Sequence, residues 1–470
     1  MKNPLFIKII LFSTIVLIAG NSLADSFSNE LSPSPPMAGP YAAQNVSALK
    51  KGVFLFGISS KTVAWFRRVE PKKSPSIRNI ARSFSRYGGF RSAKHIGGGI
   101  IAAERGGNNT AKLKRAIKIA GYAAPNYIRR SFAPVPNDTF ARFGFQWALA
   151  KEKSLFGFAK VDAGVLGAWD ITKGDPNLVV AVADTGTDPK HPDLAPNLWV
   201  NSAEIAGDGI DNDQNGYIDD VFGYNFVGKK GDIKDDNFHG SHVAGIIAAK
   251  EGNNRGIAGV APGVKIVTLK VLDAQGAGED AGIIESINYI IALKEKRGVN
   301  IRALNLSLGG PDDSDALKAA LNKAGKAGIL VVAAAGNNGG NNDDSPIYPA
   351  NYSLSLSNVI SVAANNEQGR LAYFSNYGKN SVDFAAPGTM IFSSIPGGWS
   401  FPFDGTSMAA PHVSAIAALV LSFKPKLLPA QVRDILRQSS ASYQQEGMVG
   451  KLAVPGVVNA AKALQISAAQ

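Results

Sequence analysis

The feature that most constrains the fold of this chain is a series of short, continuous apolar runs between residues 178 and 385, with helical patterns between several of them. The predicted strands are Leu178–Ala183, Val264–Val271, Ile301–Ser307, Ile329–Ala335, Val359–Ala364 and Val382–Ala385. The predicted helices include Val243–Ala249, Ile283–Glu295 and Asp315–Ala327. Strands without polar alternation are typical of a parallel sheet covered on both faces. We therefore expect an α/β domain whose functional residues lie at the carboxyl ends of its strands.

A serine lies at the start of a further apolar helix pattern, in the stretch Phe403–Val413 that continues into Ser414–Leu421. This position puts Ser407 at a helix N-terminus, where unpaired N–H groups and the helix dipole favour negative charge. One interpretation is a nucleophile whose reaction creates an oxyanion beside waiting donors. The other is an ordinary N-cap serine. A base, an orienting acid and a second donor elsewhere in the chain would favour the first.

Three polar residues at the ends of predicted elements can supply those partners. Asp184 and Asn337 each follow a predicted strand, and His239 opens a predicted helix. The pair His239 and His242 also suggests zinc, but the H-E-x-x-H pattern is missing and no cysteine can complete such a site. The order Asp184, His239, Ser407 differs from the order of the triad in chymotrypsin and in α/β-hydrolases, and no G-x-S-x-G turn is present.

Three stretches carry a resemblance to a known family: Val182-Ala183-Asp184-Thr185-Gly186 with His191-Pro192-Asp193-Leu194, His239-Gly240-Ser241-His242-Val243-Ala244-Gly245, and Gly405-Thr406-Ser407-Met408-Ala409-Ala410-Pro411-His412-Val413. On these motifs, residues from about 136 to about 463 resemble the subtilisin-like serine proteases (subtilases, peptidase S8 type). The sequence departs from the common pattern at Ser241, where Thr is common, and at Ala410, where Ser is common. The resemblance implies a three-layer α/β fold with a mainly parallel central sheet.

The resemblance also implies a mechanism, that of a serine endopeptidase that forms an acyl-enzyme. Ser407 is then the nucleophile, His239 the general base, and Asp184 the residue that orients the imidazole. The side chain of Asn337 and the N–H of Ser407 form the oxyanion hole. Calcium, where present, would be structural, and catalysis needs no cofactor.

Substrate binding is expected to be extended and led by the peptide backbone. The resemblance places two small segments on the two sides of the bound peptide: Ser307-Leu308-Gly309 and Gly276-Ala277-Gly278. The wall near Ile347-Tyr348-Pro349 borders the pocket for the residue before the cleaved bond, P1. Because no acid is dedicated to a basic side chain there, we expect an apolar P1 preference.

An acidic stretch between the Asp and His motifs carries five aspartates within 13 residues, which repel one another unless a cation neutralises them. The candidate calcium ligands are Asp208, Asp211, Asp213, Asn215, Asp219 and Asp220. The pattern is like the first half of an EF-hand loop, but Phe222 stands at the twelfth position instead of glutamate. The alternative is a solvated acidic turn. Asp193 and Asn253 match positions of a second, weaker calcium site of the family.

The N-terminal part divides into segments of different character. Residues 1–24 carry Lys2 and Lys8, an apolar run and a small-residue end, which predicts a cleaved secretory signal instead of a membrane anchor. Residues 25–130 hold 19 Lys and Arg against 4 Asp and Glu, whereas residues 131–470 hold 28 against 33. A basic nucleic-acid-binding arm is one interpretation, but no groove-reading motif is present.

After a Pro- and Ser-rich lead-in, the basic segment is expected to fold as a small α+β domain with βαβ-like order. Its predicted strands are Val53–Ile58 and Ile100–Glu104, and its predicted helices are Ile77–Tyr87 and Thr110–Ala120. By the resemblance, residues 25–130 are a propeptide that assists folding, fills the cleft and is removed by the enzyme. The protease domain is then residues 131–470, and the cut falls near residues 128–137.

The expected partners are peptide or protein substrates and the chain's own propeptide, with no nucleic acid and no membrane after signal removal. The mature protein is expected to be a secreted monomer. It would be extracellular, or periplasmic in a bacterium with an outer membrane. Two alternatives remain at this level. A non-catalytic binding protein on the same fold would need a broken triad, and none is broken. A peptide ligase would pass the acyl group to an amine instead of water.

Overall fold

The computed structural model describes residues 53–57, 90–97, 100–105, 123–125, 135–155 and 159–469. The chain forms two compact units, Met1–Arg130 and Ser131–Gln470, and each is treated by itself. The predicted signal segment and the predicted helices Ile77–Tyr87 and Thr110–Ala120 lie outside the described residues.

The described part of the first unit is a four-stranded sheet in the order β2-β3-β1-β4. Its strands are β1 (Val53–Gly57), β2 (Phe90–Gly97), β3 (Ile100–Arg105) and β4 (Ala123–Pro125). Both predicted strands are present, but β1 and β3 pair antiparallel, whereas a simple βαβ unit would make them parallel. The reason is that β2 and β3 form an antiparallel hairpin. The chain therefore reverses direction after β2, and β3 runs antiparallel to β1 where the two strands pair.

The second unit is built on a seven-stranded sheet in the order β11-β10-β9-β8-β5-β7-β6, in which every neighbouring pair is parallel. The strands are β5 (Val179–Asp184), β6 (Gly223–Asn225), β7 (Lys265–Lys270), β8 (Ile301–Leu306), β9 (Leu330–Ala334), β10 (Val359–Asn365) and β11 (Phe384–Pro387). All six predicted strands are confirmed to within two residues at each end. Only the short edge strand β6 was not predicted, because three residues with Gly and Asn carry little strand signal.

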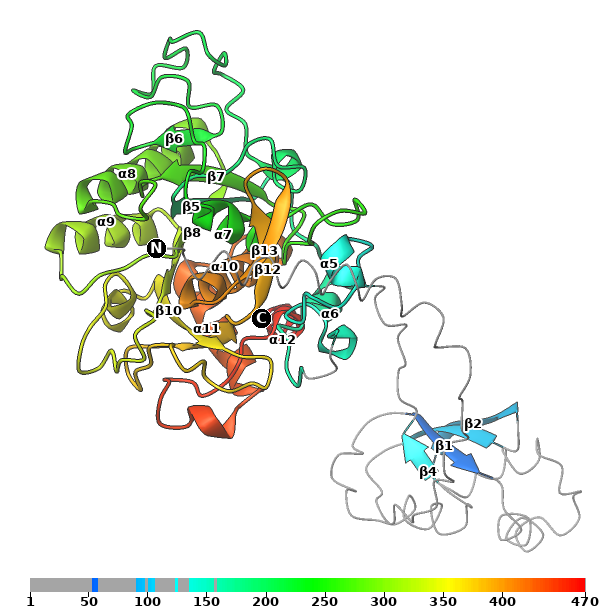
Figure 1. Ribbon diagram of the computed structural model, residues 1–470. Coiled ribbons are helices and arrows are strands. Elements are labelled where there is room, and N and C mark those ends of the chain that lie inside the picture. Colours follow the sequence, from blue (N-terminus) through cyan, green and yellow to red (C-terminus); the bar gives the residue numbers. More distant parts are fainter. Residues whose placement is uncertain are drawn as a thin grey trace, which may run out of the picture. The chain divides into compact units, whose positions relative to one another are not determined.

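Helices cover both faces of this sheet (Figure 1). They are α5 (Thr139–Arg142), α6 (Val165–Trp169), α7 (His239–Ala248), α8 (Asp280–Arg297), α9 (Asp315–Lys326), α10 (Thr406–Phe423), α11 (Pro429–Ala441) and α12 (Ala460–Ala468). In the described part of this unit, short 3-10 helices lie at Lys151–Lys153, Ala195–Asn197, Ala350–Leu354 and Glu446–Met448. The start of α9 is capped by the Ser314 hydroxyl, which accepts the Leu317 N–H.

The two largest apolar clusters of the core lie one on each face of the sheet. Val180 and Val182 of β5 pack with α7 and α10, whereas Val179, Ala181 and Ala183 pack with α8 and α9. Successive residues of a strand point to opposite faces, so a strand between two helical layers must be apolar at every position. The predicted three-layer α/β fold is confirmed.

A two-stranded antiparallel hairpin stands outside the main sheet and precedes α10. It consists of β12 (Ile391–Ile395) and β13 (Trp399–Phe403). Within the described part of the chain, α10 is the helix whose length and composition would suffice to cross a membrane, but 83% of it is buried inside the fold. It is therefore the core helix of this unit.

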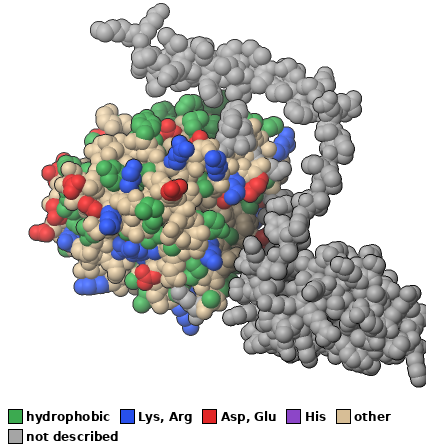
Figure 2. All heavy atoms as spheres, turned by 90° about the horizontal axis from the view of Figure 1, so that it is seen from below, with side chains coloured by type: hydrophobic (Ala, Val, Ile, Leu, Met, Phe, Trp, Pro, Cys, Tyr) green, Lys and Arg blue, Asp and Glu red, His purple; other side chains and the backbone are tan. Residues whose placement is uncertain are grey.

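Charged side chains are spread over the surface of the second unit. Figure 2 shows one face, on which Lys and Arg side chains lie among Asp and Glu side chains and apolar groups. On this face neither sign of charge covers a continuous area.

Candidate active site

Asp184 and His239 meet at the carboxyl end of β5. Asp184 is the last residue of that strand and is 1% exposed. Its Oδ1 lies 2.7 Å from Nδ1 of His239 and also accepts the Thr185 N–H at 2.8 Å. Because a carboxylate only accepts hydrogen bonds, Nδ1 carries the hydrogen, and Nε2 of the neutral ring keeps its lone pair. This is the tautomer that a general base requires.

The environment of His239 makes its imidazolium easier to form. Burial lowers the pKa of His239, but the negative charge of Asp184 and the hydrogen bond to it raise that pKa more, with a smaller contribution from the charge of Asp235. The net pKa lies above the ordinary value of 6.5. A raised pKa makes the imidazole a stronger base, which accepts a proton more readily during catalysis.

The position of His239 depends on Asp235, a residue that the motif comparison did not single out. The Asp235 carboxylate accepts two backbone N–H groups just before α7 and, through Oδ2, the Ser241 N–H at 2.8 Å. An acid close to a helix start, where N–H groups lack partners within the helix, is a signal that could have been noticed. Gly240 lets the helix approach the strand end, since a Cβ there would lie 2.1 Å from the Gly186 carbonyl oxygen.

Ser407 is the second residue of α10, and its hydroxyl does not cap the helix. Its Oγ donates to the Ser307 carbonyl at 3.2 Å, so in this conformation it binds that oxygen instead of His239. In return, the Ser307 hydroxyl donates to the Ser407 carbonyl at 2.9 Å. That carbonyl needs a donor because Pro411, four residues later, has no N–H to continue the helix ladder. The N-cap interpretation of Ser407 is therefore wrong.

Asn337 lies three residues after β9, and Thr406 fixes its orientation. Its side-chain oxygen accepts both the Thr406 N–H at 2.8 Å and the Thr406 hydroxyl at 2.9 Å. The Thr406 hydroxyl in turn accepts the Gly336 N–H at 3.1 Å. With its oxygen bound on one side, the amide of Asn337 presents its NH₂ group on the other. Thr406 was not predicted as a site residue; its place before the serine was the only signal.

His239, Asn337 and Ser407 open onto one cavity of about 750 Å³. The predicted peptide-contacting residues line the same cavity: Gly276, Gly278, Ser307, Leu308 and Gly309. The residues of the predicted P1 wall, Ile347, Tyr348 and Pro349, line it as well. Asp184 is not among the lining residues; it lies behind His239. The structure thus gathers the segments after β7, β8 and β9 and the starts of α7 and α10 around one cleft.

Two of the cleft glycines are required by the protein's own backbone as well as by a substrate. A Cβ on Gly278 would lie 2.2 Å from the Val271 carbonyl oxygen, and one on Gly309 would lie 2.8 Å from that of Tyr348. The Gly309 position also contacts Ile347, whose Cγ2 would be 3.1 Å from such a Cβ. Close packing within the fold is therefore a sufficient reason for glycine at these positions.

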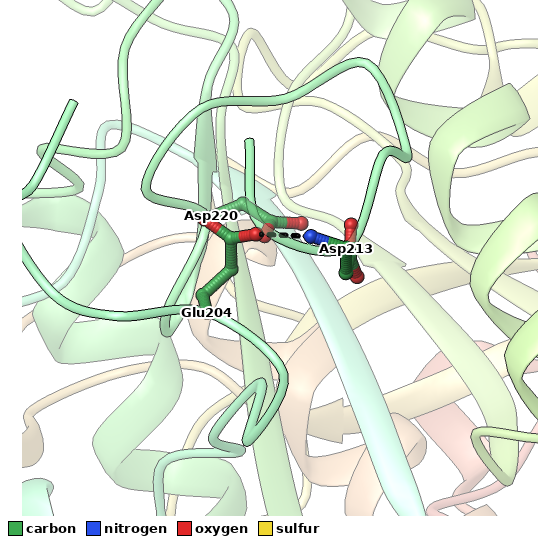
Figure 3. A group of neighbouring side chains, drawn as sticks. All are labelled: Glu204, Asp213 and Asp220. Atoms are coloured by element: carbon green, nitrogen blue, oxygen red, sulfur yellow. Dashed lines mark hydrogen bonds between the residues drawn. The ribbon is translucent and has the colours of Figure 1, made fainter. Parts of the chain in front are cut away.

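Two carboxylates of the acidic stretch, Asp213 and Asp220, converge with that of the preceding Glu204 (Figure 3). One oxygen from each lies within 4.8 Å of the others. Burial raises the pKa of Asp220 to about 6, although hydrogen bonds from Tyr289, Asn215 and Asn201 oppose this rise. A set of close, partly buried carboxylate oxygens fits a hard cation such as Ca²⁺. Glu204 was missed because it precedes the stretch in which ligands were sought.

The other candidate ligands of the acidic stretch bind hydrogen-bond donors of the loop itself. Asp208 accepts from Ile210 N–H and Asn212, Asp211 from two backbone N–H groups, and Asp219 from Gly207 and Gly209. Asn215 donates to Asp220 at 2.8 Å. The converging carboxylates accept such donors too: Glu204 accepts the N–H groups of Asp213 and Asp219, and Asp220 accepts from Tyr289, Asn201 and Asn215. What distinguishes Asp213 and Asp220 from the other candidates is their convergence with Glu204.

The residues predicted for a second cation site, Asp193 and Asn253, are neighbours. The Asn253 amide donates to Asp193 Oδ1 at 2.7 Å, and the Ile257 N–H donates to Asp193 Oδ2 at 3.1 Å. Both carboxylate oxygens of Asp193 thus already accept hydrogen bonds. The carboxylate of Asp138 accepts the N–H groups of Gly252 and Asn253 and is thereby held beside this pair. Burial, with a smaller contribution from the charge of Asp193, raises the pKa of Asp138.

Comparison with known proteins matches this geometry to one family. The sequence profile described as the subtilase family (peptidase S8) matches residues 175–457. Subtilisin NAT from Bacillus subtilis subsp. natto is 33% identical over 348 residues, which is 73% of this chain and 80% of that protein. Subtilisin-like protease 1 from Plasmodium falciparum is 36% identical over 277 residues, covering 55% of this chain and 39% of that protein.

A solved structure agrees with the sequence comparison. A protease from Pseudoalteromonas arctica is 29% identical, with a TM-score of 0.55, over 71% of this chain and all of that one. The profile match spans more than half of the chain and includes the ends of β5, α7 and α10 that meet at the cleft. The chain belongs to the subtilase family and is a serine endopeptidase.

Proposed function

We propose that Asp184, His239 and Ser407 form the catalytic triad of this endopeptidase. The observation that carries the proposal is the 2.7 Å bond between Asp184 and His239 at the edge of the cavity that Ser407 also lines. His239 Nε2 takes the proton of the Ser407 hydroxyl as that oxygen attacks the scissile carbonyl. The protonated ring, stabilised by Asp184, then gives the proton to the leaving amine, and water hydrolyses the acyl-enzyme.

The oxyanion of the tetrahedral intermediate is bound by the side-chain NH₂ of Asn337 and the N–H of Ser407. The support for this role is the pair of hydrogen bonds from Thr406, which fixes the amide before the substrate arrives. The N–H of Ser407 is in the first turn of α10, where the helix dipole favours an anion. A donor that is already oriented costs no reorganisation when the charge develops.

Replacement of the nucleophile or of the side-chain donor tests these assignments. We expect Ser407→Ala to lower kcat by ~10⁶-fold and Asn337→Ala by ~10²–10³-fold, the losses found in subtilisin itself. Both are measured on an unstructured peptide, with Ser442→Ala, an exposed serine at the end of α11, as the matched control. Parent-like hydrolysis by Ser407→Ala would contradict the assignment.

The raised pKa of His239 predicts the acid side of the pH profile. His239 must be neutral to act as a base, so kcat/KM falls as pH drops through the pKa of the free enzyme's histidine. Because that pKa is raised, we expect the midpoint above 6.5. The Asp184→Asn variant lacks the negative charge and the charged hydrogen-bond acceptor that raise the pKa of His239 most. We expect this variant to have a lower midpoint, together with a lower rate. An unchanged midpoint in this variant would argue against the pair. The control is Asp170→Asn, at an exposed acid just after α6, which should keep the parent's midpoint.

We further propose that residues 1–24 are a secretory signal and that residues 25–130 are a propeptide removed by the enzyme. The support for the signal is the apolar run that follows Lys2 and Lys8. The support for the propeptide is the charge split, 19 Lys and Arg against 4 acids in residues 25–130 and 28 against 33 in residues 131–470, which favours attraction that salt screens beyond about 8–10 Å. Peptides and the propeptide are then the partners of the cleft, and the enzyme is exported.

N-terminal sequencing tests export and self-processing together. We expect the mature parent enzyme to begin near residues 128–137. Ser407→Ala, which cannot cleave, is expected to retain the chain from Asp25. A Ser407→Ala protein with the parent's mature N-terminus would mean that another protease does the processing.

We also propose that Glu204, Asp213 and Asp220 hold a structural calcium ion. Bound Ca²⁺ would neutralise the repulsion among these three carboxylates. Among the described residues, Arg297 is the positively charged side chain that forms an ion pair with the group, 3.6 Å from Asp213. Removal of the ion by a chelator should lower the thermal midpoint by several degrees, since a ligand at 100 times its Kd contributes about 2.7 kcal/mol.

The variant Asp220→Asn links that shift to this group. We expect its midpoint to respond far less to the chelator than the parent's does. Asp344→Asn, an acid whose partner Asn341 lies elsewhere in the unit, serves as the control and should respond like the parent. If the chelator lowered the thermal midpoints of Asp220→Asn and the parent equally, the ion would have to bind elsewhere in the protein.

A further inference from the structure

Asn337, the side-chain donor proposed for the oxyanion, lies on an exposed part of a loop. The loop runs from the end of β9 to Pro349, and both Asn337 and Asn338 are exposed to solvent. A donor stabilises a developing charge best when it is held in place before the reaction. Thr406 binds the side-chain oxygen of Asn337, but that contact does not fix the backbone from which the side chain extends. The loop backbone therefore needs a support of its own.

Asn376, on the connection between β10 and β11, supplies such a support. Its backbone N–H donates to the Gly336 carbonyl at 2.9 Å, and its side-chain oxygen accepts the Asn338 N–H at 3.0 Å. These two bonds fall on the residues immediately before and after Asn337. The same side-chain oxygen accepts the Gly340 N–H at 3.1 Å. One residue thus binds the loop on both sides of the oxyanion donor.

The orientation of the Asn376 amide is itself determined by its neighbours. Backbone N–H groups only donate, so the amide oxygen must face Asn338 and Gly340, and the NH₂ group must face away from them. That NH₂ group donates to Oδ1 of Asn342 at 2.9 Å. The NH₂ group of Asn342 donates to the Ala335 carbonyl at 2.8 Å, which fixes the Asn342 amide in turn. Asn342 and Asn376 are 0% and 1% exposed, so these bonds lie inside the protein.

A third buried asparagine extends this arrangement to the wall of the predicted P1 pocket. Asn351 is 6% exposed, and its NH₂ group donates to the Asn342 carbonyl at 2.8 Å. Its side-chain oxygen accepts the N–H of Ile347, in the P1 wall, at 3.3 Å. We call Asn342, Asn351 and Asn376 the asparagine frame. The frame connects the loop that carries Asn337 to the wall of the same cavity.

Gly336 lets Asn376 lie directly against the loop. Gly336 has φ 112°, in the region that favours glycine, and a Cβ there would lie 2.6 Å from Nδ2 of Asn376. The backbone just before Asn337 therefore packs on the asparagine frame as well as binding it. A contact this close leaves little room for the loop to shift unless Asn376 moves too.

We propose that Asn376 is a positioning residue for the oxyanion donor. It binds the backbone on both sides of Asn337, and the other two asparagines of the frame hold its amide in the required orientation. Asn376 is not among the residues that line the cavity, so it acts through Asn337 and not on the substrate. The proposal rests on the oxyanion role proposed for Asn337.

The test is a double-mutant cycle between Asn376→Ala and Asn337→Ala. Each variant is made as the full chain, and kcat on an unstructured peptide is divided by the amount of Ser407 that a fluorophosphonate labels. This normalisation removes any loss that is due to unfolded protein. We expect Asn376→Ala to lower kcat about 10- to 100-fold with little change in KM, because misplacing a catalytic group by about 1 Å can cost about 10²-fold. In the Asn337→Ala background, where the donor is already absent, the same change should cost about twofold or less.

The matched control is Asn358→Ala. Asn358 is a buried asparagine whose NH₂ group donates to the Leu321 carbonyl at 3.0 Å, and neither residue lines the cavity. We expect this variant to have a lower thermal midpoint and the parent's kcat per labelled serine. The conservative variant Asn376→Asp keeps an acceptor for the loop N–H groups and should restore part of the kcat that Asn376→Ala loses.

A second variant keeps the proposal testable if Asn376→Ala does not fold. Asn342→Ala removes the acceptor of the Asn376 NH₂ group, so it should also lower kcat per labelled serine and lose that effect in the Asn337→Ala background. It then enters the same cycle and decides the proposal.

The outcomes separate this inference from the proposed catalytic function. The positioning role alone would be overturned if Asn376→Ala kept the parent's kcat per labelled serine. It would also be overturned if Asn376→Ala lowered kcat as much in the Asn337→Ala background as in the parent. A parent-like kcat in Asn337→Ala would instead overturn the oxyanion role on which the inference rests.

Discussion

The hydrogen bond between Asp184 and His239 depends on much of the architecture of this protein. A carboxylate at 1% exposure is costly unless a partner compensates it, and β5 carries Asp184 to the edge of a sheet covered on both faces. The partner can reach it only because α7 begins at that edge. Asp235 binds the N–H groups at the start of the helix, and Gly240 lets the helix approach the Gly186 carbonyl. The pair is thus a product of strand, helix start and loop together.

On the opposite side of the cleft, Ser407 lies where the backbone hydrogen-bond pattern of α10 is interrupted. Pro411 leaves the Ser407 carbonyl without its helical donor, and the Ser307 hydroxyl from the end of β8 supplies one. The same turn holds Thr406, which orients Asn337 from the end of β9. One short segment of α10 therefore organises two strand ends, and the serine and the oxyanion donor are set relative to each other by direct hydrogen bonds.

The β12–β13 hairpin extends this organisation beyond the cleft. His242 lies one turn after His239 on α7 and binds the Phe401 carbonyl, so the helix that presents the base also anchors the strand that leads to the nucleophile. The resulting connection joins the two halves of the site by a route that does not pass through the main sheet.

The sequence by itself determined the α/β class, six of the seven strands of the main sheet, and the residues gathered at the cleft, because continuous apolar runs and short motifs are local signals. It did not determine the βαβ-like order expected for the first unit, where β1 and β3 pair antiparallel, nor the carboxylate group, which includes Glu204. Only the tertiary structure decided the partners of Ser307, Thr406, Asp235, His191 and His242. Those contacts join residues up to 208 positions apart, and their distances depend on how helices pack on the sheet, which no local pattern encodes.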